Sequence, residues 1–321
     1  MRRMPTILWL RTAALAGVLA VSVPLAAADS GSWTPVADWP ALPDGWTTGE
    51  VAGVGVDSHN HVFVFHRGKE KSVLCIEGAT GKIVSSFGDG LFINAHGLEV
   101  DGDDNVWITD TRRHQVMKFS HEGELLLSIG EKGVAGVDAS HFDQPTDVVV
   151  SASGEFYVSD GYGNNRVVKF SADGTFLREW GEKGAGPGQF DLPHGLALDD
   201  SGRVYVADRA NQRVQVFDGD GSFLDEWGTD RLGEGSRPWG LEYSSDGRLY
   251  VIDGGNMNPG TPDYARISIL DLDGKLVDSW SSYGTEPGRL SWGHDVAVGA
   301  DGAVYTAEVR NSRRAQKFVA K

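Results

Sequence analysis

Residues 96–109 read HGLEVDGDDNVWIT and residues 194–207 read HGLALDDSGRVYVA, and the same pattern recurs four more times. The other copies are AGVGVDSHNHVFVF from Ala52, TDVVVSASGEFYVS from Thr146, WGLEYSSDGRLYVI from Trp239 and HDVAVGADGAVYTA from His294. Successive copies start 44, 50, 48, 45 and 55 residues apart. Internal similarity at roughly this period is typical of repeat architectures such as β-propellers.

Each copy predicts short strands that alternate between apolar and polar residues and are separated by tight turns. In the fourth copy, Leu196 and Leu198 flank Ala197, residues 199–202 form a turn, and strands follow at 204–206 and 214–217. Ser-Gly or Asp-Gly pairs at the turns are typical of hairpins. A fourth strand carries an apolar and aromatic run, as at 176–180 and 223–227.

Four strands in each of six copies predict an all-β chain folded as a six-bladed β-propeller. The last copy ends near Phe318 after three strands, so we expect the segment around Trp33–Trp39 to supply the fourth and close the ring. Residues 29–321 are then one propeller domain with no linker. No helical pattern of useful length follows residue 28.

The N-terminus is predicted to be an export signal over residues 1–28. Arg2 and Arg3 precede an apolar stretch through Leu25, and three alanines supply a cleavage site. This signal predicts a secreted or periplasmic protein with no membrane attachment after cleavage; the alternative is a retained anchor. The protein is expected to be a monomer. The formal charge of −16 disfavours nucleic acid as a partner. Cys75 is the single cysteine, so an internal disulfide is excluded.

Histidine occupies the first repeat position in copies two, four and six, as His96, His194 and His294. In a closed six-fold ring these three imidazoles lie about 120° apart and point to one place on the axis. A lone histidine at the start of a buried strand is usually structural, but three in alternate copies predict a metal site. Three protein ligands around an open position are the arrangement of catalytic zinc.

The loops after the second strand of each copy are predicted to lie on the same face as these histidines. Arg67 and Arg209 occupy the same repeat position there, and Tyr162 lies one residue beyond it in the third copy. Two cations and a phenol are therefore expected at the mouth of the site. Of the remaining histidines, His114 and His141 are expected to pack, whereas His59, His61 and His121 lie in turn-like segments and are expected to be solvated.

Several segments resemble the peptidyl-α-hydroxyglycine α-amidating lyases, within the wider group of NHL-repeat propellers, over most of the chain. They include FHRG at 65–68, AHGLEVD at 95–101, SDGYGNNR at 159–166, PGQFDLPHGLAL at 187–198, ADR at 207–209 and GHD at 293–295. The resemblance implies a lyase that splits a carbinolamide, R–CO–NH–CH(OH)–COO⁻, into an amide and glyoxylate. It implies a peptide or small-molecule substrate with an α-hydroxyglycine-like end, which another protein must hydroxylate.

The resemblance also implies roles for particular residues. His96, His194 and His294 match zinc ligands; Asp295, with the backbone carbonyls of Val54 and Leu98, matches a structural calcium site; and Arg67, Tyr162 and Arg209 match residues that contact substrate. Zinc would act as a Lewis acid on the substrate hydroxyl. A phenol becomes a useful base when a cation stabilises its phenolate, so Tyr162 beside Arg67 is the expected general base and Arg209 the carboxylate-binding residue.

Two departures from the family pattern bear on specificity and stability. Trp292 stands where the animal enzymes carry methionine, and it is expected to reshape the pocket wall. The paired cysteines of those enzymes are absent, with Gly163 and Val204 at two of the places.

Two other functions remain open at this point. One is a non-enzymatic NHL-repeat binding or scaffold propeller in which the histidines hold a structural metal. The other is a calcium-dependent six-bladed hydrolase or lactonase, which would need several carboxylates at the mouth of its channel.

Overall fold

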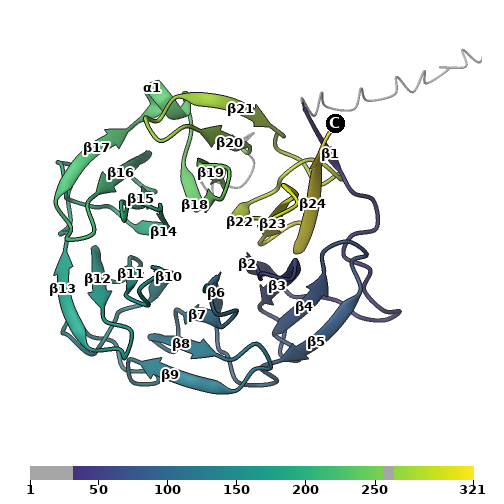
Figure 1. Ribbon diagram of the computed structural model, residues 1–321, viewed down its shortest axis with the longest axis horizontal. Helices are drawn as coiled ribbons and strands as arrows, with labels where there is room; N and C mark the ends of the chain where they lie inside the picture. Colours follow the sequence, from purple (N-terminus) through teal and green to yellow (C-terminus); the bar gives the residue numbers. More distant parts are fainter. Residues whose placement is uncertain (1–31, 256–263) are drawn as a thin grey trace, which may run out of the picture.

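Six four-stranded antiparallel sheets stand in a ring around a central axis in the computed structural model, which describes residues 32–255 and 264–321 (Figure 1). The predicted six-bladed β-propeller is confirmed. The predicted export signal at 1–28 lies outside the described residues. Within the described ranges, no helix is both long and apolar enough to cross a membrane.

The blades follow one another in chain order, each from an inner strand to an outer one. Blade one holds β2 (Val51–Val56), β3 (His61–His66), β4 (Val73–Glu77) and β5 (Ile83–Phe87). Blade two holds β6 (Ala95–Val100), β7 (Val106–Asp110), β8 (Gln115–Phe119) and β9 (Leu125–Ile129). Blade three holds β10 (Pro145–Val150), β11 (Phe156–Asp160), β12 (Arg166–Phe170) and β13 (Phe176–Trp180).

The second half of the ring continues in the same way. Blade four holds β14 (Pro193–Leu198), β15 (Val204–Asp208), β16 (Arg213–Phe217) and β17 (Phe223–Trp227). The one-turn helix α1 (Thr229–Leu232) leads to blade five, with β18 (Pro238–Ser244), β19 (Arg248–Asp253), β20 (Ile267–Leu270) and β21 (Leu276–Trp280). Blade six holds β22 (Gly293–Val298), β23 (Val304–Glu308), β24 (Arg314–Ala320) and, on its outer edge, β1 (Trp33–Pro35).

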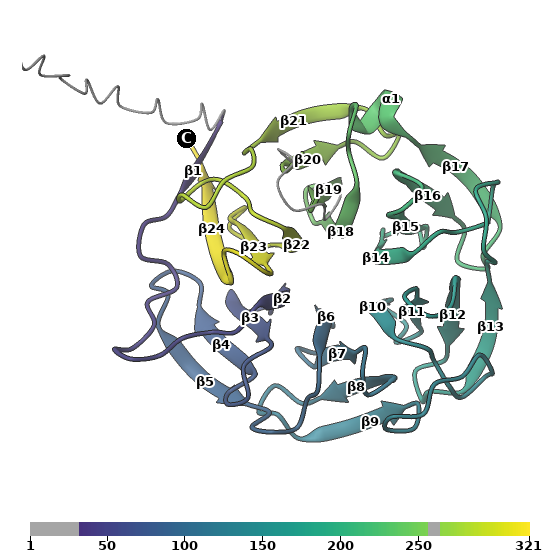
Figure 2. The ribbon, with the colours of Figure 1, turned by 180° about the vertical axis from the view of Figure 1, so that it is seen from behind.

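The ring is closed by the N-terminal strand, as the sequence predicts. β1 pairs antiparallel with β24, with Trp33 opposite Ala320 and Pro35 opposite Phe318, and Figure 2 shows the two strands side by side. Trp33 also stacks on Trp280 of blade five, with ring centroids 4.5 Å apart. The start of the chain thus joins its last blade to the neighbouring one.

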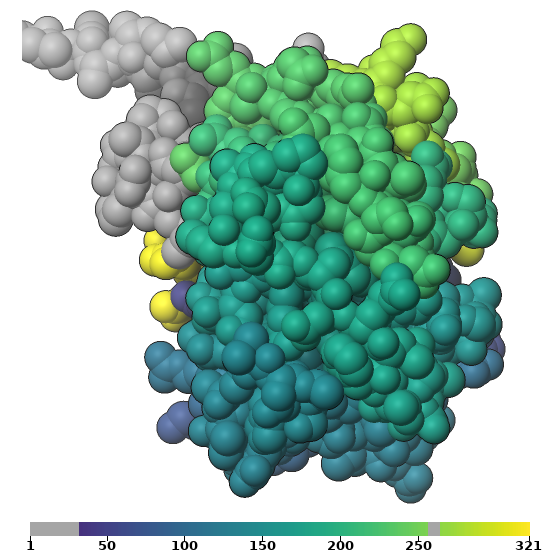
Figure 3. Space-filling view, turned by 90° about the vertical axis from the view of Figure 1, so that its left-hand side faces the viewer, coloured from purple at the N-terminus to yellow at the C-terminus, as the bar shows by residue number. Residues whose placement is uncertain are grey.

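The core lies between neighbouring sheets. The second strands β7, β11 and β15 are buried at every residue, whereas the outer strand β13 is exposed at its centre. Large aromatic rings fill the gaps between blades, as where Trp107 packs on Phe156 with centroids 4.6 Å apart. Such rings each bury about 150–250 Å². Figure 3 shows the outer wall of the ring from one side, where the teal and green parts of the chain face the viewer.

The inner strands position the site, and each of them contains a register shift near the recurrent repeat position. In blade two the shift lies between Ala95 and Leu98, and in blade six it lies between Gly293 and Asp295. A bulge re-aims side chains because two residues oppose one on the partner strand. Consecutive residues such as His294 and Asp295 can therefore both approach the axis.

Candidate metal centre and substrate cavity

Three buried imidazoles meet on the axis of the ring. His96, His194 and His294 stand near the starts of β6, β14 and β22, and their ring centroids lie 4.5 to 5.0 Å apart. One potential metal-binding nitrogen from each lies within 4.8 Å of the other two. The alternating repeat therefore brings its three histidines to one place, as expected from a closed ring.

The backbone of the next blade fixes the orientation of each imidazole. Nδ1 of His96, His194 and His294 donates to the carbonyl oxygens of Thr146, Trp239 and Ala52, at 2.6, 2.8 and 2.6 Å respectively. These carbonyls belong to the recurrent position in the copies that lack histidine. A proton held at Nδ1 leaves the lone pair at Nε2, and such a hydrogen bond is the usual support of a metal-binding histidine.

Burial keeps these imidazoles neutral. It lowers the pKa of His96 to about 3, with the charge of Arg67 adding to the effect, and it holds the pKa values of His194 and His294 well below their usual range. His294 Nε2 is buried without a hydrogen-bond partner. A buried acceptor of that kind calls for a ligand. The residues present therefore fit a zinc ion held by three histidines.

The phenol of Tyr162 lies directly over this centre. Its oxygen is 3.1 Å from His96 Nε2 and 3.3 Å from His194 Nε2, and 38% of the residue is exposed. The loop that carries it needs its flanking glycines: a Cβ on Gly161 would lie 1.7 Å from the carbonyl oxygen of Pro193. The Gly-Tyr-Gly sequence thus allows the blade-three loop to press against blade four.

The guanidinium beside Tyr162 is that of Arg209, which differs from the expected pairing with Arg67. Arg209 Nη1 donates to the phenol oxygen at 3.5 Å, and the guanidinium lies 3.5 Å from the centroid of the Trp239 ring. Arg67 instead donates through Nε to the Ala95 carbonyl oxygen at 3.1 Å and forms an ion pair with Glu50. The loop of blade four reaches the phenol, while the loop of blade one anchors its arginine to the inner strand of blade two.

A cavity of about 240 Å³ opens above the histidines. Its walls are made by Arg67, Asn94, Thr111, Arg112, Gln144, Tyr162, Trp239, His294, Val309 and Arg310. Three of these described wall residues are arginines and none is acidic, although the whole chain carries a formal charge of −16. The cavity is therefore suited to a ligand with a carboxylate.

A second axial cavity of about 210 Å³ is lined by Val54, Leu98 and Asp295, the residues expected at a calcium site. Asp295 Oδ2 accepts a hydrogen bond from the backbone nitrogen of Val54 at 3.0 Å. Three further carboxylates, which the sequence reasoning missed, line the same cavity: Glu99, Asp147 and Glu242.

Ionisation of all four carboxylates, those of Glu99, Asp147, Glu242 and Asp295, is unfavourable in this cavity when no cation is bound. Burial raises the pKa of Asp147 to about 7 and that of Glu242 to about 8. Burial and the neighbouring negative charges raise the pKa values of Glu99 and Asp295 well above their usual range. A hard divalent cation with oxygen ligands would relieve both effects, so this cavity fits calcium.

The additional carboxylates of the second cavity occupy recurrent positions that could have revealed them in the sequence. Asp147 and Asp295 stand one residue after the recurrent position, and Glu99 and Glu242 stand three residues after it. The bulges in the inner strands turn these residues to the axis, and a strict alternation of two does not foresee this. Trp292 lies near the centre without lining the substrate cavity: it is buried against Trp239, with centroids 6.4 Å apart.

Comparisons with known proteins identify the family of this chain. Residues 142–170 and 190–217 match the NHL repeat family. The probable peptidyl-α-hydroxyglycine α-amidating lyase of Caenorhabditis elegans is 31% identical, over 83% of this chain and 81% of that protein. The chain belongs to the peptidyl-α-hydroxyglycine α-amidating lyase family. The predicted family membership is confirmed.

Some relatives of this chain are much larger proteins, whereas others are of similar length. Peptidyl-glycine α-amidating monooxygenase B of Xenopus laevis is 33% identical over 84% of this chain, which spans about a third, 34%, of its length. The human NHL repeat-containing protein 3 is similar to the same degree, 32% identical over 88% of this chain and 82% of that protein. Overall identity alone therefore does not assign the activity, and the site residues must decide it.

Solved structures share the fold of this chain at low sequence identity. A gluconolactonase from Xanthomonas campestris has a TM-score of 0.63 at 14% identity, covering 86% of this chain and 87% of its own. Virginiamycin B lyase from Staphylococcus aureus has a TM-score of 0.57 at 15% identity, covering 89% and 87%. At these identities the likeness concerns the propeller fold alone.

Proposed function

We propose that this chain is a zinc-dependent carbon–nitrogen lyase that splits a peptidyl-α-hydroxyglycine-like carbinolamide into an amide and glyoxylate. The observation that supports this proposal most directly is the position of the Tyr162 phenol over three converging imidazoles. The cavity beside it is lined by three arginines. The family relatives named as amidating lyases support the same reaction.

His96, His194 and His294 would hold the zinc ion. Each has its Nδ1 proton committed to a carbonyl oxygen, so each presents a neutral Nε2 without reorganisation. A bound zinc would supply Lewis acidity toward the hydroxyl oxygen of the carbinolamide. The neutral imidazoles leave most of its charge available for that purpose.

Tyr162 is the proposed general base. The reaction needs only one net proton movement, from the hydroxyl oxygen to the amide nitrogen that leaves. A Tyr162 phenolate takes the hydroxyl proton while the electrons of the O–H bond form the aldehyde and those of the C–N bond go to nitrogen. The phenol then returns the proton to that nitrogen, so the residue ends as it began.

The arginines have separate proposed tasks. Arg209 donates to the Tyr162 oxygen and stabilises negative charge there, and its stacking on Trp239 keeps it in place. Arg67 lines the cavity in which the substrate carboxylate would bind. Its ion pair with Glu50 and its hydrogen bond to Ala95 orient the guanidinium.

Calcium is proposed as a structural ion in the second cavity, with Asp295 and the carbonyl groups of Val54 and Leu98 among its ligands. The additional carboxylates Glu99, Asp147 and Glu242 strengthen that proposal because they line the same cavity. They lie outside the arginine-walled cavity above the histidines. A lactonase that uses calcium carboxylates at the channel mouth is therefore less favoured than the lyase.

The test is to incubate the purified protein with α-hydroxyhippurate and to measure glyoxylate, after metal removal and after zinc is restored. Glyoxylate release that depends on zinc is expected. A zinc-loaded protein that releases none above background would exclude the lyase for this substrate class. Zinc-dependent stability without turnover would instead favour the non-enzymatic NHL propeller.

A further inference from the structure

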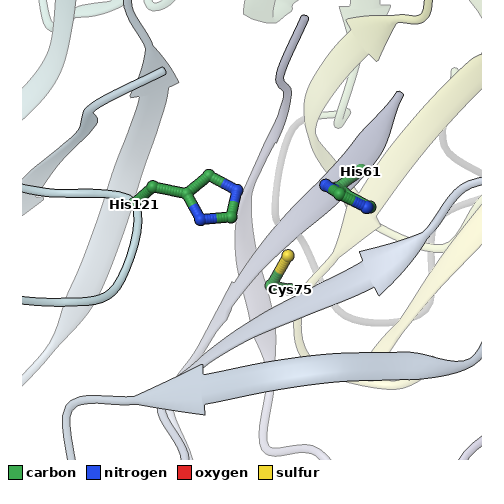
Figure 4. A group of neighbouring side chains, drawn as sticks. All are labelled: His61, Cys75 and His121. Carbon is green, nitrogen blue, oxygen red and sulfur yellow. The ribbon is translucent and has the colours of Figure 1, made fainter. Parts of the chain in front are cut away.

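A second group of metal-binding side chains lies off the axis, between blades one and two. One ligand atom each from His61, Cys75 and His121 lies within 4.8 Å of the others. Figure 4 shows the two imidazoles on either side of the Cys75 sulfur. His61 and His121 were expected to be solvated, and each is only partly so, with 27% of the side chain exposed.

The strand register places these residues together. Cys75 on β4 pairs with Phe63 on β3, so His61, two residues before Phe63, lies diagonally beside Cys75 on one face of the sheet. His121 comes from the turn between β8 and β9, and its ring meets the Phe63 ring edge-on at 5.2 Å. The group therefore draws its members from two blades.

A buried carboxylate is hydrogen-bonded to both imidazoles. Asp57 Oδ2 lies 2.9 Å from His61 Nδ1 and 3.0 Å from His121 Nε2, and the Asp57 side chain is fully buried. Asp57 Oδ1 accepts the backbone N–H groups of His59 and His61, which fixes the carboxylate. Asp57 is not part of the group whose potential ligand atoms lie within 4.8 Å of one another, so its role is to orient the two imidazoles.

We propose that His61, Cys75 and His121 bind a structural zinc ion that fastens blade one to blade two, with Asp57 orienting the two imidazoles. One thiolate and two imidazoles are donors that suit zinc, and a carboxylate that is hydrogen-bonded to metal-binding histidines is a common support of such a site. Binding releases the thiol proton to solvent. Hydrogen bonds account for Asp57 and the two imidazoles, and packing in the hydrophobic core accounts for the burial of Cys75. The zinc site additionally accounts for the nearness of the sulfur to both imidazoles.

Such a site would cross-link two blades in a chain whose single cysteine cannot form an internal disulfide. It is independent of the proposed catalytic centre, since it shares no residue with the three axial histidines. Its test can therefore succeed or fail separately from the lyase assay.

The experiment compares zinc content and cobalt spectra of the full-length protein and its variants. Cobalt-loaded wild type is expected to show a near-ultraviolet thiolate-to-cobalt charge-transfer band, which an all-histidine site lacks. Cys75→Ala should lose that band and bind one zinc ion fewer than wild type. His194→Ala should keep the band, and His59→Ala, which changes an exposed neighbour outside the group, should match wild type in both measurements.

A wild type without the band, or a Cys75→Ala protein that binds as much zinc as wild type, would overturn the proposal and leave a hydrogen-bonded cluster. Should Cys75→Ala fail to fold, His121→Gln provides the same comparison from the other blade. Loss of one zinc ion in that variant is expected, and an unchanged zinc content would equally overturn the site.

Discussion

At the scale of single residues, the chemistry depends on a phenol oxygen that two imidazoles and one guanidinium surround. Tyr162→Phe removes only this oxygen, so the variant should keep its zinc and lose about 10²- to 10⁴-fold in kcat. Glyoxylate release and zinc content measured on one preparation check both parts. Tyr283→Phe, on a remote exposed tyrosine, is the matched control. Unchanged turnover in Tyr162→Phe would remove the phenol from the mechanism.

Substitutions of Arg67 and Arg209 should change different kinetic constants. Arg67→Met removes a group proposed to bind the substrate carboxylate and should raise KM about ten- to hundredfold, the range of a lost charged hydrogen bond. Arg209→Met removes the donor to Tyr162 and should mainly lower kcat. Steady-state kinetics of both variants decide between these roles. Glu50→Gln controls for breaking the Arg67 ion pair, and the reverse pattern would exchange the two assignments.

At the scale of strands, the glycines that follow His96 and His194 set how closely the inner strands approach. A Cβ on Gly195 would lie 2.5 Å from the Trp239 carbonyl oxygen, which also accepts the His194 Nδ1 proton. Gly195→Ala should therefore destabilise the fold by about 1–3 kcal/mol and weaken zinc binding about ten- to hundredfold. Denaturant unfolding and zinc titration measure the two effects.

Gly102→Ala is the control for that change, because a Cβ there meets no atom within 4 Å. It should unfold and bind zinc like wild type. If Gly195→Ala behaves the same way, the close approach of β14 and β18 does not limit the site.

The strands also show what the sequence allows one to predict. The alternation of apolar and polar residues, together with the turn residues, suffices to predict the six sheets. The recurrence of histidine in every second copy suffices to predict the axial site. Both predictions depend on repetition along the chain. The pairing of Tyr162 with Arg209 depends on how two loops cross from different blades, which repeat spacing does not contain. The axial position of Asp147 depends on a bulge, and the His61–Cys75–His121 group depends on a contact between blades.

At the scale of the whole molecule, one three-residue strand joins the two ends of the propeller. Trp33 of β1 is buried against Trp280, and its Nε1 donates to Asp278 at 3.1 Å. Trp33→Ala should lower the free energy of unfolding by about 3–5 kcal/mol, as expected for a large buried aromatic side chain. Urea unfolding followed by circular dichroism tests this. Leu126→Ala, on an outer strand with 52% of the residue exposed, should cost far less.

The acidic cavity gives the whole ring a dependence on pH and on calcium. The pKa of Asp147 rises from 3.8 to about 7 and that of Glu242 from 4.5 to about 8, so the folded state binds more protons than the unfolded chain between these values. Without calcium, stability should therefore fall as pH rises through this range, by at most about 1.4 kcal/mol per pH unit for each carboxyl. The buried histidines have lowered pKa values and act oppositely, but only below about pH 6.5.

Unfolding measured between about pH 6.5 and 8.5 reports the effect of the carboxylates without that of the histidines. In a calcium-selective chelator the melting temperature should fall across this range, and added calcium should raise it more at the upper end, because the ionised carboxylates bind the cation. Replacing Asp147 by Asn and Glu242 by Gln together removes the ionisation at nearly constant shape and should flatten the profile. A wild type whose stability in chelator does not change with pH would show that the four carboxylates are not crowded in the folded ring.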